Sequence, residues 1–375
     1  MAIPYGHQSI NDDDIASVVE VLRGDWLTMG PVHAAFEAAL ATLAGTTDAL
    51  AVTSGTAALH CAYVAAGVGP GDEVVTTPMT FVATAATAAL LGATITFADI
   101  DGVTRNIDPA AVEAAMTERT KVVAAVDYAG HPADLDELLE IAHRHGALLL
   151  EDAAHSIGSV YRGRPVGGIA DMTEFSFFPT KNMTTGEGGA LLSTDPGLVD
   201  RVRRFRGQGM IPDRSQMRRR DEGGWFQEVH SFGINYRLPD ILSALGLSQL
   251  ARLEAFKARR TAIYDRYNAA LSDLDGVGLP AKRDDVDPMW HLYPIRIRDG
   301  QRKRVYNAMR ERGILVQVNY IPVYWHPVFE DMGYRRGMCP VAELFYEEEL
   351  SLPMYVELTD ADQDHVIEVL RGAVA

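Results

Sequence analysis

Lys181 and Asp152 are the residues of this chain whose surroundings most clearly suggest chemistry. Lys181 lies in the run SFFPTKNMTTGEGG, and Asp152 ends the run LLLED. A lysine amine can form an imine with an aldehyde, and a carboxylate at the end of a buried strand can keep a pyridine nitrogen protonated. Together they predict chemistry on a cofactor that carries both an aldehyde and a pyridine ring.

Each of the two residues also has an ordinary structural interpretation. Asp152 precedes AAHS and could simply start a helix. Lys181 could be a solvated side chain in a glycine-rich turn. Neither interpretation explains why the two motifs occur together with a third one.

The third motif, TSGTAAL, has the features of a phosphate site. A strand-like run, ALAV, ends just before Ser54, Gly55 and Thr56, and a helix-like run follows at once. Free backbone N–H groups at a helix start bind phosphate, glycine permits close approach, and the hydroxyls add donors. The motif is neither a Walker loop nor a dinucleotide fingerprint. With Lys181 and Asp152 it predicts pyridoxal 5'-phosphate (PLP) as the cofactor.

Composition limits the possible classes of protein. The chain has 375 residues, 47% of them hydrophobic, and a net charge of −17, which argues against nucleic acid as a partner. Cys61 and Cys339 are too few for a disulfide framework, so we expect a cytoplasmic protein. Residues 74–98 carry no charge, but threonines, Pro78 and Gly92 interrupt them, and we predict no membrane span or signal peptide.

The order of elements predicts an α/β fold. Up to residue 194, β-rich runs alternate with helical ones, which is typical of a mainly parallel sheet covered by helices. The predicted strands are ALAVTS, EVVTT, TITFAD, KVVAAV, ALLLED, EFSFF and GALLST. Helix starts are predicted at Asn11, at Asp108-Pro109 and at His131-Pro132.

A long helical stretch from Pro239 predicts the division into domains. We expect a large PLP-binding domain over residues 1–250 and a smaller α+β domain over 251–375. The N-terminal segment is expected to pack on the small domain.

Seven motifs in sequence order resemble the PLP-dependent nucleotide-sugar aminotransferases. They are SGTAAL, TFVAT, FADIDG, VDYAGHPADLDEL, EDAAHSIG, SFFPTKNMTTGEGG and FGINYRLPDILSALGLSQL. The resemblance covers nearly the whole chain. It implies the aspartate-aminotransferase fold, which is fold type I of the PLP enzymes, and a homodimer with shared active sites.

The resemblance also implies roles for single residues. Lys181 would condense with the cofactor aldehyde and later act as the acid and base of the reaction. Asp152 would pair with the pyridine nitrogen, His155 would lie beside the ring hydroxyl, and Phe81 would stack on the ring. Some relatives that carry histidine in place of the lysine dehydrate the sugar, so the lysine of this chain implies transamination.

The phosphate contacts implied by the resemblance come from two subunits. Ser176 and Thr56 match phosphate ligands, together with the backbone of Gly55 and the adjacent Ser54. Asn235, in GINYR, matches the residue that reaches the phosphate of the neighbouring subunit.

Finer resemblance points to the sugar. IPYGHQSI, NYIPVYWHP and SLPMY are similar to enzymes that move the amine of glutamate to C4 of UDP-4-keto-6-deoxy-N-acetylhexosamines in the pseudaminic acid pathway, with 2-oxoglutarate as co-product. The product there is UDP-4-amino-4,6-dideoxy-N-acetyl-β-L-altrosamine. Phe178 in place of histidine, and SGT in place of SAT, depart from that subgroup.

Four aromatic or histidine side chains are predicted to contact the substrate: Tyr5, His7, Tyr320 and His326. Arg214 and the run 218–220 could bind a diphosphate, although a solvated loop explains them as well. His143 and His145 suit a helix end better than a metal site. Alternative functions are amination of another keto-sugar nucleotide or a keto-inositol, and a PLP-bound regulator without catalysis.

Overall fold

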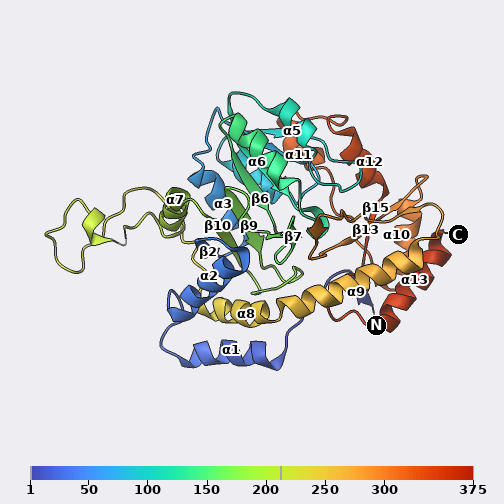
Figure 1. Cartoon of the computed structure of the whole chain (residues 1–375), viewed down its shortest axis with the longest axis horizontal. Coiled ribbons are helices and arrows are strands. Elements are labelled where there is room, and N and C mark those ends of the chain that lie inside the picture. The colour runs from blue at the N-terminus through green and yellow to red at the C-terminus, as the bar shows by residue number, and fades with distance from the viewer. Residues whose placement is uncertain (1, 212, 375) are drawn as a thin grey trace.

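A seven-stranded sheet forms the centre of the molecule (Figure 1). The computed structural model describes residues 2–211 and 213–374. The strand order is β2-β10-β9-β6-β5-β3-β4. The strands are β2 (Asp48–Val52), β3 (Glu73–Thr76), β4 (Thr94–Phe97), β5 (Thr120–Val126), β6 (Leu148–Asp152), β9 (Met172–Ser176) and β10 (Gly189–Ser193).

All seven strands predicted from the sequence lie in this sheet. Neighbouring strands from β4 to β9 run parallel, and β10 is antiparallel to both β2 and β9. The α/β fold with a mainly parallel sheet is therefore confirmed. The carboxyl ends of β6 and β9 lie side by side, because Asp152 is in register with Glu174. Such an edge is where open parallel sheets bind ligands.

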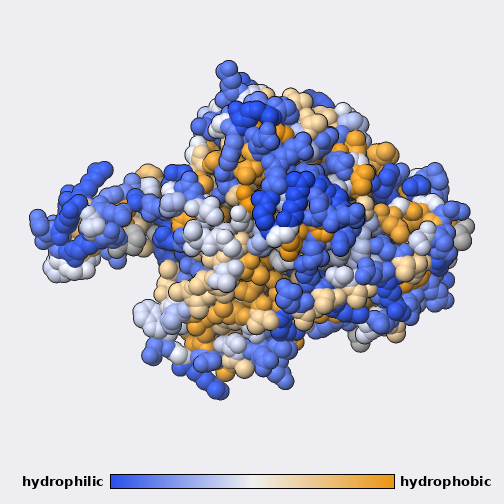
Figure 2. All heavy atoms as spheres, viewed as in Figure 1, coloured by the Kyte–Doolittle hydropathy of each residue, from blue (hydrophilic) through white to orange (hydrophobic). Residues whose placement is uncertain are grey.

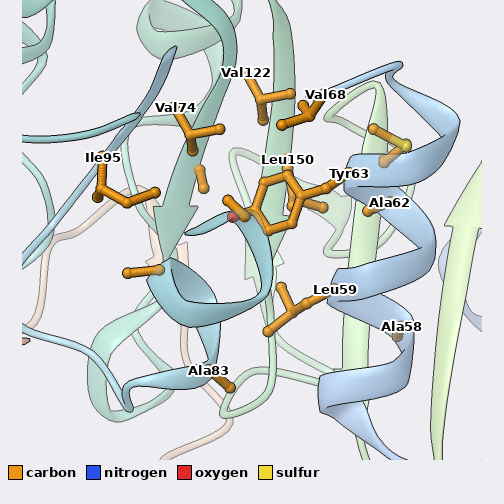
Figure 3. Close-up of a cluster of buried hydrophobic side chains, with 14 of the residues drawn as sticks. Ala58, Leu59, Ala62, Tyr63, Val68, Val74, Ala83, Ile95, Val122 and Leu150 are labelled. Carbon is orange, nitrogen blue, oxygen red and sulfur yellow. The ribbon is translucent and has the colours of Figure 1, made fainter. Parts of the chain in front are cut away.

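Helices cover both faces of the sheet. On one face lie α3 (Gly55–Ala65), α4 (Ala83–Leu90) and α7 (Pro196–Arg206). Figure 3 shows Leu59 and Tyr63 of α3 packed toward Val74, Val122 and Leu150 of the strands. On the other face lie α2 (Pro31–Ala44), α5 (Pro109–Ala115), α6 (Leu135–Arg144) and α8 (Asp240–Ala251). Strands buried on both faces explain the unbroken apolar runs of the sequence.

The C-terminal part forms a second core around the antiparallel sheet β11-β13-β15. Its strands are β11 (Val277–Gly278), β13 (Tyr293–Ile297) and β15 (Glu349–Leu352). Its helices are α9 (Leu253–Leu271), α10 (Arg302–Glu311) and α13 (Asp360–Val374). The helices α11 (Pro327–Asp331) and α12 (Pro340–Glu348) pack through Phe329 and Phe345 against the core of the large sheet.

The N-terminal strand β1 (Ile3–Pro4) pairs with β14 (Ile314–Leu315) of this C-terminal part. A short sheet of β7 (Val160–Tyr161), β8 (Arg164–Pro165) and β12 (Val286–Asp287) links the two parts. We propose a domain boundary near residue 250, where α8 passes into α9 at Arg252.

Two of the three predicted helix starts agree with the structure. Asn11 forms a capping box with Asp14 at the start of α1 (Asp12–Arg23), and Asp108 caps α5. The start predicted at His131-Pro132 is wrong, since α6 begins at Leu135. The reason is tertiary: the Asn106 amide donates to the carbonyls of His131 and Pro132, which holds this segment in another conformation.

One segment extends away from the body at the left of Figure 1. This arm comprises residues 209–211 and 213–233, including the short helix η2 (Arg214–Gln216). Its base is closed by antiparallel pairing of Met210 with Val229. Among the described residues, no helix has the length and apolar character needed to cross a membrane.

Candidate active site

The Lys181 loop begins where strand β9 ends. Ser176 is the last residue of β9, and the loop then places Lys181 close to the end of β6. The Asn182 side chain anchors the loop, because its amide donates hydrogen bonds to the carbonyls of His155 (2.6 Å) and Met289 (3.1 Å). The sheet and the loop thereby bring together the two residues that the sequence singled out.

The surroundings of Lys181 favour its neutral amine. Burial lowers the pKa of Lys181 below its ordinary value, while the charges of Asp152 and Glu174 partly oppose this shift. Removal of an ammonium group from water is unfavourable, so burial is the dominant cause. A neutral amine is the form that can attack an aldehyde or accept a proton.

Asp152 is held at the end of β6 by hydrogen bonds. Thr84, near the start of α4, donates its hydroxyl to Asp152 Oδ2 at 2.6 Å. The backbone N–H of Ala154 donates to Oδ1 at 3.3 Å. Asp152 is 4% exposed, and these contacts fix its orientation toward the site.

His155 lies between two other aromatic rings. Its Nε2 is 3.1 Å from the Tyr320 hydroxyl, and its ring centroid is 4.3 Å from that of His291. Burial, with the nearby charge of Lys181, lowers the pKa of His155 well below its ordinary value. Burial also lowers the pKa of His291 strongly, and the charges of His155 and Lys181 add to this. Both rings are therefore neutral near pH 7.

The paired rings predict a loss of stability in mild acid. The unfolded chain binds a proton at each histidine below about pH 6.5, whereas the folded protein does not. His155 and His291 together should lower the free energy of unfolding by about 2.7 kcal/mol for each pH unit below that value. In His291→Gln this contribution should fall to about half, measured by urea unfolding between pH 5 and 7.5. The exposed His365→Gln is the control, and an unchanged slope in His291→Gln would contradict the assignment.

The start of α3 has the geometry of a phosphate site. Ser54 caps the helix by accepting the N–H of Ala57 at 3.1 Å. Gly55 is buried, and a Cβ there would collide with Glu174 Oε1 and approach Ser176 Cβ to 2.9 Å. Thr56 is exposed at the first turn. Because position 55 has no side chain, α3 can pack closely against β9, which places Ser176 beside the N-terminus of the helix. The free N–H groups and hydroxyls gathered there form a cradle that fits a phosphate group.

Gly55→Ala tests this cradle. The added methyl group should displace Glu174 and Ser176 and weaken PLP affinity by about 5- to 150-fold, the equivalent of about 1–3 kcal/mol of overpacking. Titration of the cofactor-free protein with PLP would measure the effect. Gly69→Ala is a matched control, because a Cβ at Gly69 meets no atom within 4 Å.

Several other predicted residues surround this group. Phe81 is 59% exposed, and its ring meets that of Tyr320 at 6.3 Å, so the two aromatic side chains lie at one site. A Cβ added at Gly6 would lie 3.5 Å from Thr180, the neighbour of Lys181. The segment with Tyr5 and His7 therefore lies beside the lysine loop. The His7 ring is exposed and lies 3.9 Å from Glu357.

Three other residues predicted to take part in binding do not contact Lys181, Asp152 or His155 through hydrogen bonds or ion pairs in the part of the chain that the structure describes. Among the described residues, no hydrogen bond or ion pair connects the side chains of Asn235 or His326 with Lys181, Asp152 or His155. Asn235 is exposed in a bridge with Gly207. Arg214 donates to backbone carbonyls of its own loop.

The two histidines considered as metal ligands each lie against a single carboxylate. His143 lies 2.9 Å from Asp171, and His145 lies 3.0 Å from Glu113. Over residues 2–211 and 213–374, no three His, Cys, Asp or Glu side chains are arranged to hold a metal ion.

Four residues of the site were not predicted from the sequence: Thr84, Glu174, Asn182 and His291. A carboxyl inside an apolar strand, as in the run MTEFS, is unusual and could have indicated Glu174. His291 carries no local signal, because only folding brings it onto His155.

Comparison with known proteins gives consistent results along the whole chain. Residues 8–371 match the model of the DegT/DnrJ/EryC1/StrS aminotransferase family. The spore coat polysaccharide biosynthesis protein SpsC of Bacillus subtilis is 41% identical over 378 residues, which cover 99% of this chain and 97% of that protein.

Solved structures extend the comparison. PseC of Helicobacter pylori, an aminotransferase involved in the biosynthesis of pseudoaminic acid, superimposes with a TM-score of 0.93 at 31% identity, covering 100% of this chain and 99% of PseC. Spr1654 of Streptococcus pneumoniae in its PMP form also has a TM-score of 0.93, at 30% identity, covering 99% of each chain. The same protein is known in a PLP form.

Proposed function

This chain belongs to the DegT/DnrJ/EryC1/StrS aminotransferase family, and from this premise we propose that it moves an amino group from L-glutamate to C4 of a nucleotide-linked 4-keto-6-deoxy sugar. It is a sugar aminotransferase that uses PLP. The proposed acceptor is a UDP-4-keto-6-deoxy-N-acetylhexosamine. Similarity to PseC over the full length supports this choice of sugar.

The observation that carries the proposed chemistry is the position of Lys181. Its amine is buried, and the charges of Asp152 and Glu174 act on it, while it acts in turn on His155. PLP, when bound, supplies an aldehyde that accepts the amino group and a ring that accepts electrons. Each of the nearby side chains has a separate task toward that group.

We assign these tasks as follows. Lys181 would hold the cofactor through its aldehyde, and its Nζ would accept and return the proton that moves during the reaction. Asp152, oriented by Thr84, would keep the ring nitrogen protonated. Neutral His155, oriented by the Tyr320 hydroxyl, would contact the ring hydroxyl.

The remaining assignments concern binding and orientation. Ser54, Gly55, Thr56 and Ser176 would hold the phosphate, and Phe81 would stack on the ring. Tyr5, His7, Tyr320 and His326 are proposed to contact the sugar. The buried free thiols of Cys61 and Cys339 fit a reducing compartment, and we propose the cytoplasm.

The substrate is tested with a panel of acceptors and glutamate as donor. The expected result is amination of a UDP-4-keto-6-deoxy-N-acetylhexosamine at C4, detected by mass spectrometry and formation of 2-oxoglutarate. Turnover of a keto-inositol, with no reaction on any nucleotide sugar, would overturn the proposed substrate. A holoenzyme whose absorbance does not change with glutamate would instead favour a PLP-bound regulator.

We further propose a homodimer in which the partner completes the active site. The arm carries apolar side chains that one subunit leaves in solvent: Trp225 is 84% exposed and Phe232 is 99% exposed. Figure 2 also shows apolar atoms gathered over α1, α2 and α8, where Val21, Trp26 and Leu247 line a groove. Asn235, at the foot of the arm, would reach the phosphate of the other subunit.

If the arm lies in the dimer interface, a polar substitution in the arm should weaken the dimer. Phe232→Ser should raise the dimer dissociation constant about tenfold or more, because the residue would be buried in both subunits. Sedimentation velocity over a concentration series would measure it. Val103, a second exposed apolar residue (59%) outside the arm, provides the control Val103→Ser. Equal dissociation constants for Phe232→Ser and the unmodified protein would exclude the arm from the interface.

A further inference from the structure

Glu174 is a carboxyl group of the active site to which the proposed reaction gives no task. It lies in the middle of β9, in register with Asp152 on the neighbouring strand β6. Residues in register on parallel strands point to the same side of the sheet. Glu174 is 1% exposed, so its carboxyl group is buried beside that of Asp152.

The surroundings of Glu174 do not suit an ionised carboxylate. Among the described residues, none donates a hydrogen bond to either of its oxygens. The groups that face it are the Asp152 carboxylate, the Lys181 amine, the backbone of Gly55 in α3, and apolar Leu191 of β10. A buried carboxylate without donors is strongly disfavoured.

The balance of charges favours the protonated form. Burial raises the pKa of Glu174 well above its ordinary value, and the neighbouring charge of Asp152 raises it further, while Lys181 lowers it. Lys181 acts on Glu174 through its charge, and no ion pair joins the two side chains among the described residues. Two adjacent buried carboxyl groups normally share one proton.

A phosphate bound at the start of α3 would also favour the neutral form of Glu174. Glu174 Oε1 lies against Gly55, at the cradle that fits the phosphate. A negative charge at Glu174 would repel that anion, whereas a neutral acid would not.

We propose that Glu174 is a protonated carboxylic acid that donates its hydrogen bond to the Asp152 carboxylate. Thr84 already donates to Asp152 Oδ2, whereas Oδ1 accepts only the 3.3 Å contact from the Ala154 N–H and can accept a further hydrogen bond. The pair then carries a single negative charge, which matches one protonated ring nitrogen. Glu174 is thus a positioning residue that acts through Asp152, and this consequence rests on the proposed function.

Infrared difference spectroscopy of the full-length holoenzyme tests the protonation directly. Subtraction of the Glu174→Gln spectrum from that of the unmodified protein at pH 7.5 should show the C=O stretching band of a carboxylic acid, which should shift in D₂O. Glu151→Gln, on the opposite face of β6, shows where another buried acid absorbs. A carboxylate band in place of the acid band would overturn the proposal.

Cofactor affinity provides the second measurement. Glu174→Gln keeps a neutral donor and should hold PLP within about threefold of the unmodified affinity, whereas Glu174→Leu loses the donor and should bind about tenfold or more weakly. A tenfold change in Glu174→Gln, or none in Glu174→Leu, would contradict the hydrogen bond to Asp152. Failure of PLP to attach at Lys181 would refute the proposed function, but the infrared band would still decide the state of Glu174.

Discussion

Replacement of Lys181 by alanine is expected to lower the turnover number by about a thousandfold or more. The amine is the covalent attachment point in our proposal and also moves the proton, so its removal abolishes two tasks at once. Steady-state amination of the best acceptor, followed by mass spectrometry, measures the loss. Because the lysine loop is fixed by Asn182 and not by Lys181 itself, the variant should still fold.

The control for this prediction is Lys303→Ala, on the exposed side of α10, which should keep full activity. A direct chemical test accompanies it. Borohydride treatment of the holoenzyme and peptide mapping should find a pyridoxyl group on the peptide that contains Lys181. Continued multiple turnover by Lys181→Ala, or an unmodified peptide in cofactor-saturated protein, would refute the assignment.

Asp152→Asn has the second largest expected effect, a loss of about a hundredfold or more in turnover. Asparagine has nearly the same shape, and its amide oxygen can still accept the Thr84 hydroxyl, so the change removes the negative charge and the weaker acceptor of the Ala154 N–H. Without that charge, nothing in the site would keep the ring nitrogen of bound PLP protonated, and the ring would accept electrons less readily. The pH dependence of the holoenzyme absorbance should change together with turnover.

Glu151→Gln is the matched control for Asp152→Asn. Glu151 precedes Asp152 on the same strand, but it points to the opposite face, where Thr173 donates to its Oε2 at 2.8 Å. Burial raises the pKa of Glu151 well above its ordinary value, so glutamine resembles the form already present. Activity within about threefold of the unmodified protein is expected, because the change lies across the sheet from the site. Equal losses in the two variants would indicate a general effect on β6 and not a role of the Asp152 charge.

The difference between Asp152 and Glu151 illustrates what could be predicted from the sequence. A run of apolar residues followed by two acids predicts a buried strand with carboxyl groups at its end. Alternation along a strand places the two acids on opposite faces, but it does not say which face carries the site. Only the packing of α3 and α4 on one face assigns Asp152 to the site and Glu151 to the other side.

The wrong and the missing sequence predictions have a common cause, because each depends on a residue distant in the sequence. The start of α6 is wrong because Asn106, distant in sequence, holds residues 131–132. Glu174 and His291 were not predicted, because their partners come from other elements. Asn235 stays a prediction, since its proposed partner belongs to a second subunit.

Local sequence by itself determined the seven strands, the helix starts at Asn11 and Asp108, and the lysine and aspartate that predict PLP, because apolar periodicity and capping act over a few residues. Tertiary structure alone decided which side chains lie together at the site and how strongly burial and neighbouring charges shift their pKa values. The reason is physical: burial and charge depend on distances across the sheet, and those distances exist only after β6, β9, α3 and the Lys181 loop have packed together.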